Sequence, residues 1–409
     1  MDNIAGSPVE GENFYGRESV VKHLREILVN DDILLLGPRR IGKTSTARAV
    51  MTAVRAEGWR AIEINVASCV DERGFLDKLD AALTPELASI TAKTKDAITD
   101  AFSAIGGRIK SLKIPVGVGS VGVELGDGEA EDWAKVANDV LRLIAQAEER
   151  WLIYVDELPI LLFTIIRNDP QNGVQRVRRF LDWFRNDVRA LPDARKVRWL
   201  VSGSVGLDTL VQEHGMADTI NSMSHQGLAA FSELVAIAML GELADSYEIE
   251  LSAVDKQHIV AAVQWPQPYY LQMAFHHLRV LMTADAAANP ASLIEQAMDN
   301  MVQPGTDNDF HHWEQRLGLQ LCRADADHAL ALLTFAASDP TGARAETLFD
   351  KLHERMSNAT AEEAKRTFIR LRDILLRDAY WWADETSGVK RYRFRLEPLR
   401  RWWLRRDTL

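Results

Sequence analysis

Short apolar runs alternate with helical patterns in the first part of the chain. Four runs are typical of buried strands, and they lie at 32–37, 60–66, 151–155 and 197–201. Amphipathic helical patterns separate them, as in 43–57 and 175–191. Alternating strands and helices indicate an open, mainly parallel sheet with helices on both faces. We therefore predict an α/β domain over residues 1–231.

The gap between the second and third predicted strands is long. It holds helical patterns at 74–83 and 85–105, followed by a stretch at 113–125 that alternates valine with glycine and other small residues. This alternation predicts a glycine-rich β-hairpin. A nucleotide-binding glycine loop would need a strand before it and a helix after it, so we interpret the hairpin as structural. Inserted helices and hairpin together occupy about 84–130.

Helical patterns fill most of the remaining sequence. Ser232 and Ser252 are candidate N-caps of two helices in the region 232–324, which we predict to be an all-helical lid. From about residue 325 three helical patterns precede two short strand patterns at 378–383 and 390–396. Three helices followed by a hairpin are typical of a winged helix, so residues 325–409 form the third predicted domain.

Composition and charge narrow the class of protein. The chain has 409 residues, 47% of them hydrophobic, and a formal net charge of -11. An acidic chain is a poor candidate for coating nucleic acid without sequence preference, although a local basic face is compatible with it. Its two cysteines fit neither a disulfide framework nor a zinc site. No secretory signal is visible and the most apolar stretch, 151–166, is short and charged, so we expect a cytoplasmic protein with no membrane segment.

A phosphate-binding pattern, G-x-x-x-x-G-K-[ST], follows the first predicted strand and opens a long helix. Its residues are Gly37, Pro38, Arg39, Arg40, Ile41, Gly42, Lys43 and Thr44, with Ser45 after them. Such a loop surrounds a phosphate with backbone N–H groups, and the helix N-terminus adds partial positive charge. Lys43 would contact the β- and γ-phosphates, and Thr44 would offer its hydroxyl to Mg²⁺. We therefore predict that the chain binds ATP and Mg²⁺.

Two carboxylates follow the third predicted strand. Asp156 and Glu157 would lie at the carboxyl edge of the sheet, where open α/β sheets bind ligands. Asp156 is our candidate for holding Mg²⁺, and Glu157 for polarising the attacking water. Alternatively, the two acids cap the helix that follows them.

Small polar residues end the fourth predicted strand, at 202–204. The hydroxyl of Ser202 could sense the γ-phosphate or orient water, but small polar residues also simply terminate strands. An arginine that stabilises transition-state charge is expected from a nearby element or another subunit. The candidates in this region are Arg178, Arg179 and Arg198.

These motifs, in this order, resemble a known family. The segment 14–18, which reads Phe-Tyr-Gly-Arg-Glu, resembles the F-x-G-R-E motif of the archaeal-type ATPases, which belong to the STAND and AAA-related P-loop NTPases. The segments 37–45, 154–157 and 201–204 are similar to later motifs of the same family. The resemblance covers nearly the whole chain. It implies a P-loop sheet domain, a helical lid and a winged helix.

Further residues follow from the resemblance alone. It implies that Tyr15, Gly16 and Arg17 flank the adenine and that Pro268 lies against the nucleotide. The family usually has G-x-P in the lid, whereas this chain has Pro266 in place of the glycine.

Arginines alternate with apolar residues in the last predicted strand. Tyr392, Phe394 and Leu396 fall on one face, and the opposite face carries Arg391, Arg393 and Arg395. The arginine face could meet solvent, a protein partner or the backbone of DNA.

Two function classes follow. The first is a STAND-type molecular switch, in which ATP or ADP controls the contacts of the lid and winged helix with a protein partner or with further copies of the chain. The resemblance implies roles in signalling or defence, and we expect ATP hydrolysis to be slow. The alternative is a DNA-binding ATPase that uses the basic winged helix, and a scaffold that binds nucleotide without hydrolysing it is a third reading.

Overall fold

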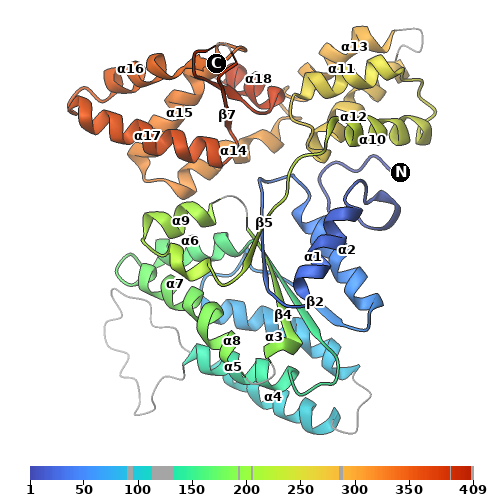
Figure 1. Ribbon diagram of the computed structural model, residues 1–409, viewed down its shortest axis with the longest axis vertical. Coiled ribbons are helices and arrows are strands. Elements are labelled where there is room, and N and C mark those ends of the chain that lie inside the picture. Colours follow the sequence, from blue (N-terminus) through green and yellow to red (C-terminus); the bar gives the residue numbers. More distant parts are fainter. Residues whose placement is uncertain are drawn as a thin grey trace. The chain divides into compact units, whose positions relative to one another are not determined.

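The computed structural model describes residues 1–89, 95–112, 132–191, 194–203, 206–284, 289–386 and 388–406. The chain forms two compact units (Figure 1). One, the sheet unit, comprises Arg17–Gly37 and Lys43–Leu228, and the other, the helical unit, comprises Met1–Gly16, Pro38–Gly42 and Ala229–Leu409. The glycine-rich hairpin predicted at 113–125 lies outside the described residues. The domain boundaries at 231 and 324 stay predictions.

A five-stranded parallel sheet forms the centre of the sheet unit. Its strands are β1 (Ile33–Leu36), β2 (Arg60–Asn65), β3 (Trp151–Asp156), β4 (Val197–Gly203) and β5 (Ser224–Gly227). They are ordered β2-β3-β4-β1-β5, and each neighbouring pair is parallel. The four predicted strands are confirmed. The sequence analysis missed β5, because Ser-His-Gln-Gly has no apolar residue and its backbone pairing with β1 alone makes it a strand.

Both faces of this sheet are buried. Helices α1 (Glu18–Leu28) and α2 (Lys43–Ala56) lie on one face, and the other helices of the unit lie mainly on the opposite face (Figure 1). Every residue of β3 is buried, because alternate side chains point to opposite covered faces. Ile153 and Val155 join the large core cluster, while Tyr154 and Asp156 share the other face.

The sheet unit has further helices, and the sequence analysis named patterns for only some of them. They are α3 (Glu72–Ala88), α4 (Lys95–Ser111), α5 (Trp133–Ile144), α6 (Leu158–Asn168), α7 (Gly173–Asp182), the π-helix Trp183–Asp187, α8 (Val188–Ala190), the 3₁₀ helices Ala194–Lys196 and Ala217–Ile220, and α9 (Leu207–Glu213). We expected a helix break before Pro85, and this is wrong, because α3 continues through it. Leu83 and Leu87, one turn apart, are both buried in the core, and this packing outweighs the hydrogen bond that proline removes.

Helices dominate the helical unit. Its elements are the 3₁₀ helix Gly11–Asn13, α10 (Glu233–Ser246), α11 (Ala253–Val263), α12 (Pro268–Ala284), α13 (Pro290–Asn300), α14 (Asn308–Gln320), α15 (Arg323–Ala337), β6 (Ala343–Arg344), α16 (Ala345–Arg355), α17 (Ala361–Arg377), β7 (Trp381–Asp384), β8 (Arg391–Phe394) and α18 (Glu397–Arg406). The predicted N-caps are confirmed, since Ser232 accepts a hydrogen bond from Val235 N and Ser252 forms a capping box with Asp255. Strands β6, β8 and β7 form a small antiparallel sheet, of which β6 was not predicted.

The regions predicted as lid and C-terminal domain share one core within the helical unit. The buried indole of Trp313 in α14 donates from Nε1 to the hydroxyl of Tyr270 in α12, at 2.9 Å. The hydroxyl of Tyr380 in turn donates to the carbonyl oxygen of Trp313, at 2.6 Å. Helix α14 is therefore tied by side chains to both regions.

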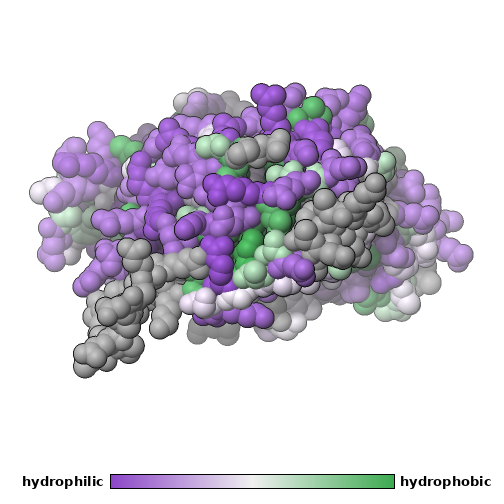
Figure 2. All heavy atoms as spheres, turned by 90° about the horizontal axis from the view of Figure 1, so that it is seen from below, coloured by the Kyte–Doolittle hydropathy of each residue, from purple (hydrophilic) through white to green (hydrophobic). Residues whose placement is uncertain are grey.

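Hydrophilic residues cover most of the face seen in Figure 2, with a smaller group of hydrophobic residues near its middle. Within the described ranges, none of the helices combines the length and the apolar character that a bilayer crossing requires.

Candidate functional site

The phosphate-loop sequence connects β1 to α2, as the strand–loop–helix pattern predicts. Lys43 is the first residue of α2, is buried, and donates from Nζ to the carbonyl oxygen of Gly37 at 2.9 Å. Arg40 and Gly42 have φ angles of 68° and 99°, a left-handed conformation that glycine adopts without strain and arginine does not. The loop is thus sharply bent at the point where the sequence pattern predicts that backbone N–H groups turn toward a phosphate.

Asp156 lies beside the first turn of α2, although it is far from that helix in the sequence. The hydroxyl of Thr44 donates to Oδ2 of Asp156 at 3.1 Å, across 112 residues of chain. Ser202, at the end of β4, is fully buried and donates to Oδ1 of the same carboxylate. Three residues from α2, β3 and β4 therefore meet at the carboxyl edge of the sheet.

The oxygen donors at this edge fit Mg²⁺. Magnesium prefers hard oxygen ligands and is commonly held by one or two protein groups together with water and phosphate oxygens. Thr44 and Asp156 supply a hydroxyl and a carboxylate within hydrogen-bond distance of each other. Among the described residues, no group of three or more histidine, cysteine or acidic side chains is arranged so that it could hold a metal ion. The chemistry of this edge therefore suits a metal that arrives with a phosphate ligand.

Glu157 directly follows β3 and occupies the N-cap position of α6 with φ at 61°. Its side chain makes no capping hydrogen bond to the helix. The capping role that we considered as an alternative thus has no hydrogen bond to support it. A left-handed non-glycine residue costs about 1–3 kcal/mol, and such strain is concentrated at functional positions.

Tyr154 was not among the predicted site residues. It is fully buried on β3, and its hydroxyl lies 3.3 Å from Oγ of Ser202. Burial raises the pKa of the Tyr154 phenol well above its ordinary value, so the hydroxyl keeps its proton. The sequence signal was available, since a tyrosine two residues before Asp156 must share its face of the strand.

The tip of the loop belongs to the helical unit. Arg40 donates from Nη1 to the carbonyl oxygen of Gly6 at 2.9 Å, and its guanidinium lies 4.4 Å from the ring centroid of Tyr269 in α12. Ile41 is buried and its N–H is 3.4 Å from the carbonyl oxygen of Pro38, whereas Arg39 is exposed. The loop tip thus contacts both the N-terminal segment and the start of α12.

Residues that the resemblance places near the adenine fall in both units. In the helical unit, Gly16 has φ at 69°, and a Cβ there would lie 2.5 Å from Cγ1 of Val235, so only glycine fits. The neighbouring Phe231 donates from its backbone N to the carbonyl oxygen of Pro266, at 3.1 Å, just before Pro268 begins α12.

Tyr15 packs against the core of the helical unit. In the sheet unit, Arg17 is buried just before α1, and burial lowers its pKa to about 10. Ser45, the last residue of the predicted loop segment, is buried in α2.

Each of the three candidate arginines of the sheet unit contacts another residue of that unit. Arg178 pairs with Asp218 at 3.1 Å, and Arg179 pairs with Asp132. Arg198 is buried near the start of β4 and donates to the carbonyl oxygen of Leu28 at 3.1 Å. Arg198 is near the start of β4 and Ser202 is near its end, so Arg198 lies at the opposite edge of the sheet from Ser202 and Asp156.

The arginines of β8 and its flank also have partners within the helical unit. Arg391 donates to the carbonyl oxygen of Gly342 at 2.6 Å, and Arg393 pairs with Asp384 at 3.2 Å. Arg395 lies over the ring of Trp265, 5.1 Å from its centroid, and burial lowers its pKa. These three side chains are only partly exposed.

Helix α18 is basic in sequence but is paired with acids. Arg400 pairs with Glu397 at 2.6 Å, and Arg406 with Glu314 at 2.8 Å. Arg401 contacts three carboxylates, those of Glu295, Glu397 and Asp299. Acidic side chains of the same unit thus neutralise the arginines of α18.

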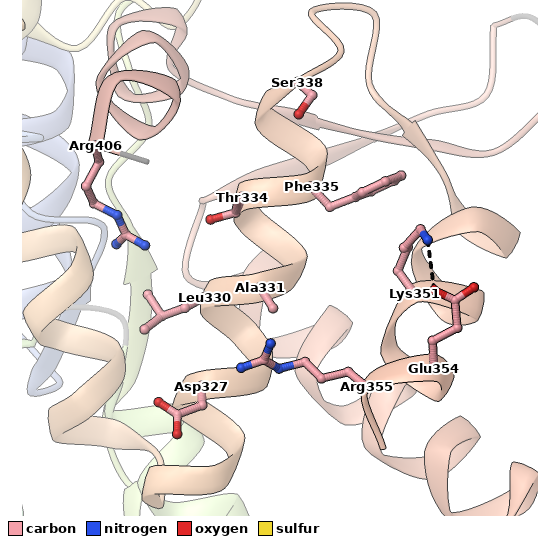
Figure 3. Close-up of a pocket in the computed structure, with 10 residues that line it drawn as sticks. All are labelled: Asp327, Leu330, Ala331, Thr334, Phe335, Ser338, Lys351, Glu354, Arg355 and Arg406. Atoms are coloured by element: carbon pink, nitrogen blue, oxygen red, sulfur yellow. Dashed lines mark hydrogen bonds and ion pairs between the residues drawn. The ribbon is translucent and has the colours of Figure 1, made fainter. Parts of the chain in front are cut away.

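A separate groove of about 820 Å³ runs along α15 (Figure 3). Apolar and hydroxyl side chains of α15 line it on one side, and on another lies α16 with the ion pair of Lys351 and Glu354 at 2.8 Å. The lining residues are Asp327, Leu330, Ala331, Thr334, Phe335, Ser338, Lys351, Glu354, Arg355 and Arg406. None of the predicted nucleotide-site residues is among them.

Comparison with known proteins supports the fold. No protein-family model and no curated protein sequence matches the chain. A Walker-type ATPase of Pyrococcus abyssi is similar in structure, with 13% identity, a TM-score of 0.63 and coverage of 98% of this chain and 99% of that one. The ORC2 protein of Aeropyrum pernix, solved in ADPNP–ADP complexes, has 13% identity, a TM-score of 0.56 and 97% coverage of both chains. The chain therefore has an α/β P-loop NTPase fold followed by a largely helical C-terminal region.

Proposed function

We propose that this protein binds and hydrolyses ATP and acts as a nucleotide-controlled switch. One observation carries the nucleotide assignment. A bent glycine loop leads into Lys43 at the N-terminus of α2, and the next residue, Thr44, is hydrogen-bonded to Asp156 at the end of β3. A helix N-terminus with a lysine and a carboxylate beside it is suited to a phosphate chain that carries a metal.

The residues have separate roles in this proposal. Backbone N–H groups of the loop residues 39–44 and the ammonium of Lys43 bind the phosphates, and Thr44 and Asp156 hold Mg²⁺. The metal supplies positive charge that offsets the charge on the phosphate oxygens. Glu157, whose side chain is partly exposed and makes no capping bond, polarises the attacking water. Turnover is expected to be slow.

The base-binding residues remain proposals drawn from the resemblance. They are Tyr15, Gly16, Arg17 and Pro268. The tight packing of Gly16 against Val235 supports a fixed backbone at this motif, since any side chain at position 16 would collide with α10.

Contacts within the helical unit support a switch. Arg40 joins the loop tip to Gly6 and to Tyr269 at the start of α12. The next residue, Tyr270, is linked through Trp313 to Tyr380, just before β7. A change at the loop tip thus has a continuous path of contacts to the C-terminal region, which we interpret as a winged helix from its element order.

The output of the switch is, in this proposal, contact with a protein partner or with further copies of the chain, in signalling or defence. DNA binding through the winged helix is the alternative that the sequence raised. Because Arg391, Arg393 and Arg395 all have partners inside the helical unit, the protein-partner version is favoured.

Nucleotide-dependent hydrogen exchange tests the switch. In the wild-type protein, saturating Mg-ATP should change amide protection in segment 1–16 and at the start of α12 relative to ADP. The variant Arg40→Ala, compared at its own saturating nucleotide concentrations, should lose this difference. Without the Arg40 side chain, the loop tip no longer contacts Gly6 or Tyr269.

The neighbouring Arg39→Ala serves as the matched comparison, since Arg39 is exposed and should not couple the loop to α12. An unchanged ATP-dependent difference in Arg40→Ala would contradict the coupling. ATP hydrolysis is checked separately by phosphate release in Mg²⁺.

A further inference from the structure

A chain of hydroxyl groups holds the carboxylate of Asp156 from inside the sheet. The hydroxyl of Tyr154 lies 3.3 Å from Oγ of Ser202, and Ser202 donates to Oδ1 of Asp156. Thr44 holds the other carboxylate oxygen, Oδ2, from the side of the phosphate loop. All of these residues belong to the sheet unit.

The direction of these hydrogen bonds follows from counting protons. A serine hydroxyl has one proton, and an ionised carboxylate can only accept. Since Ser202 gives its proton to Asp156, its oxygen must act as the acceptor toward Tyr154. The phenol of Tyr154 is therefore the donor, and the chain runs from Tyr154 through Ser202 to Asp156. Hydrogen bonds aligned in this way polarise and strengthen one another.

Strand register explains why these three residues meet. Tyr154 and Asp156 share one face of β3 because they are two residues apart. In the parallel pairing of β3 with β4, Tyr154 is opposite Leu200 and Val155 is opposite Val201, which brings Ser202 level with Asp156. Both Tyr154 and Ser202 are fully buried, so neither hydroxyl can exchange its partner for bulk water.

We propose that Tyr154 is a positioning residue for the Mg²⁺-binding carboxylate, and that it acts through Ser202 to fix the orientation of Asp156. The proposal rests on the proposed ATP and Mg²⁺ site. It assigns Ser202 to the support of Asp156, where the sequence analysis considered contact with the nucleotide. Packing alone would be satisfied by phenylalanine at position 154, so the hydroxyl is the group whose function is assigned.

The test measures the Mg²⁺ dependence of ATP binding by the full chain, using calorimetry. In Tyr154→Phe, the Mg²⁺ concentration that gives half of the metal-dependent gain in ATP affinity should rise about tenfold, as is typical when a group supporting a metal ligand is lost. Affinity for ATP in EDTA should stay within about twofold, because the phosphate loop is untouched.

Tyr392→Phe is the matched control. Tyr392 is also a fully buried tyrosine, and its hydroxyl interacts with Arg372, but it belongs to the helical unit and lies outside the path of contacts from the loop tip. Its replacement should leave the Mg²⁺ requirement unchanged. The same tenfold rise in Tyr392→Phe would attribute the effect to general destabilisation and overturn the proposal.

A double-mutant cycle separates positioning from packing. Ser202→Ala should raise the Mg²⁺ requirement at least as much as Tyr154→Phe does. Ser202→Thr keeps a hydroxyl, so its Mg²⁺ requirement should be close to that of wild type. Adding Tyr154→Phe to Ser202→Ala should cause no further loss, because Tyr154 acts through Ser202.

Additive effects, or an unchanged Mg²⁺ requirement in Tyr154→Phe, would overturn the role of Tyr154 while leaving the ATP site in place. A wild-type protein that binds no ATP, with or without Mg²⁺, would instead contradict the proposed function itself. The two failures are thus distinguishable in one set of titrations.

Discussion

Charged and polar side chains are arranged in opposite ways at the carboxyl edge of the five-stranded sheet and in the C-terminal region around β8 and α18. At the sheet edge, residues from two elements, α2 and β4, donate hydrogen bonds to one carboxylate, that of Asp156 at the end of β3. In the C-terminal region, arginines are instead distributed among separate internal partners, as in the three acids that surround Arg401.

If the sheet edge binds nucleotide as proposed, the number of charges in a segment does not determine whether it binds a charged ligand. Helix α18 carries four arginines within ten residues, yet each of the four is paired with or contacts an acid. The sheet edge has fewer charges but gathers them where a helix N-terminus adds its own partial charge. The predictions below test each half of this comparison.

The largest effect is expected at Glu157. Glu157→Gln keeps the size of the side chain but removes the base, so ATP turnover should fall by about 10²–10⁴ while ATP stays bound. Phosphate release and nucleotide retention on a desalting column measure the two quantities. Glu148→Gln changes an exposed glutamate of the same unit and should leave turnover unchanged. Equal turnover in Glu157→Gln and wild type would remove Glu157 as the water-activating group.

An intermediate effect is expected at Arg401. Its guanidinium holds three carboxylates and is 19% exposed, so Arg401→Ala should lower the free energy of unfolding by about 1–2 kcal/mol. Urea denaturation provides the measurement. Arg366→Ala breaks a pair whose side chains are 74% and 67% exposed, and it should cost far less. Equal free energies of unfolding for Arg401→Ala and Arg366→Ala would contradict the idea that the arginines of α18 stabilise the fold.

The smallest effect is expected on DNA binding. Because Arg391, Arg393 and Arg395 serve internal contacts, their combined replacement by alanine should change affinity for duplex DNA by less than about threefold at physiological salt. Fluorescence anisotropy over a range of salt concentrations measures this affinity. A triple lysine variant keeps the charge and tests the same surface. Strong, salt-dependent binding that is lost with alanine and kept with lysine would favour the DNA-binding alternative.

Much of the sheet unit could be predicted because its signals are local. The runs that form β1 to β4 are apolar, and the loop motif lies between a strand and a helix, so chain order alone placed Lys43 and Asp156 at one edge. Strand β5 has no such signal, since only pairing with β1 defines it. The continuation of α3 through Pro85 likewise depends on core packing.

The partners of charged groups were harder to predict, because they come from distant parts of the chain. Nothing near Arg401 in the sequence indicates Glu295 or Asp299, which are about a hundred residues away. The role of Ser202 was similarly hidden. Its hydroxyl could be placed at the strand end, but the contact with Asp156 depends on the register between β3 and β4.

The central claim is that the loop leading into Lys43 binds the phosphates of ATP, and calorimetric titration of ATP in Mg²⁺ tests it most directly. Lys351→Ala, which removes an exposed lysine of the other unit, is the control and should bind like wild type. The account predicts that wild type binds ATP with a dissociation constant of roughly micromolar or below. Lys43→Ala should bind ATP about a hundredfold more weakly. Equal ATP affinity in Lys43→Ala and wild type would contradict it.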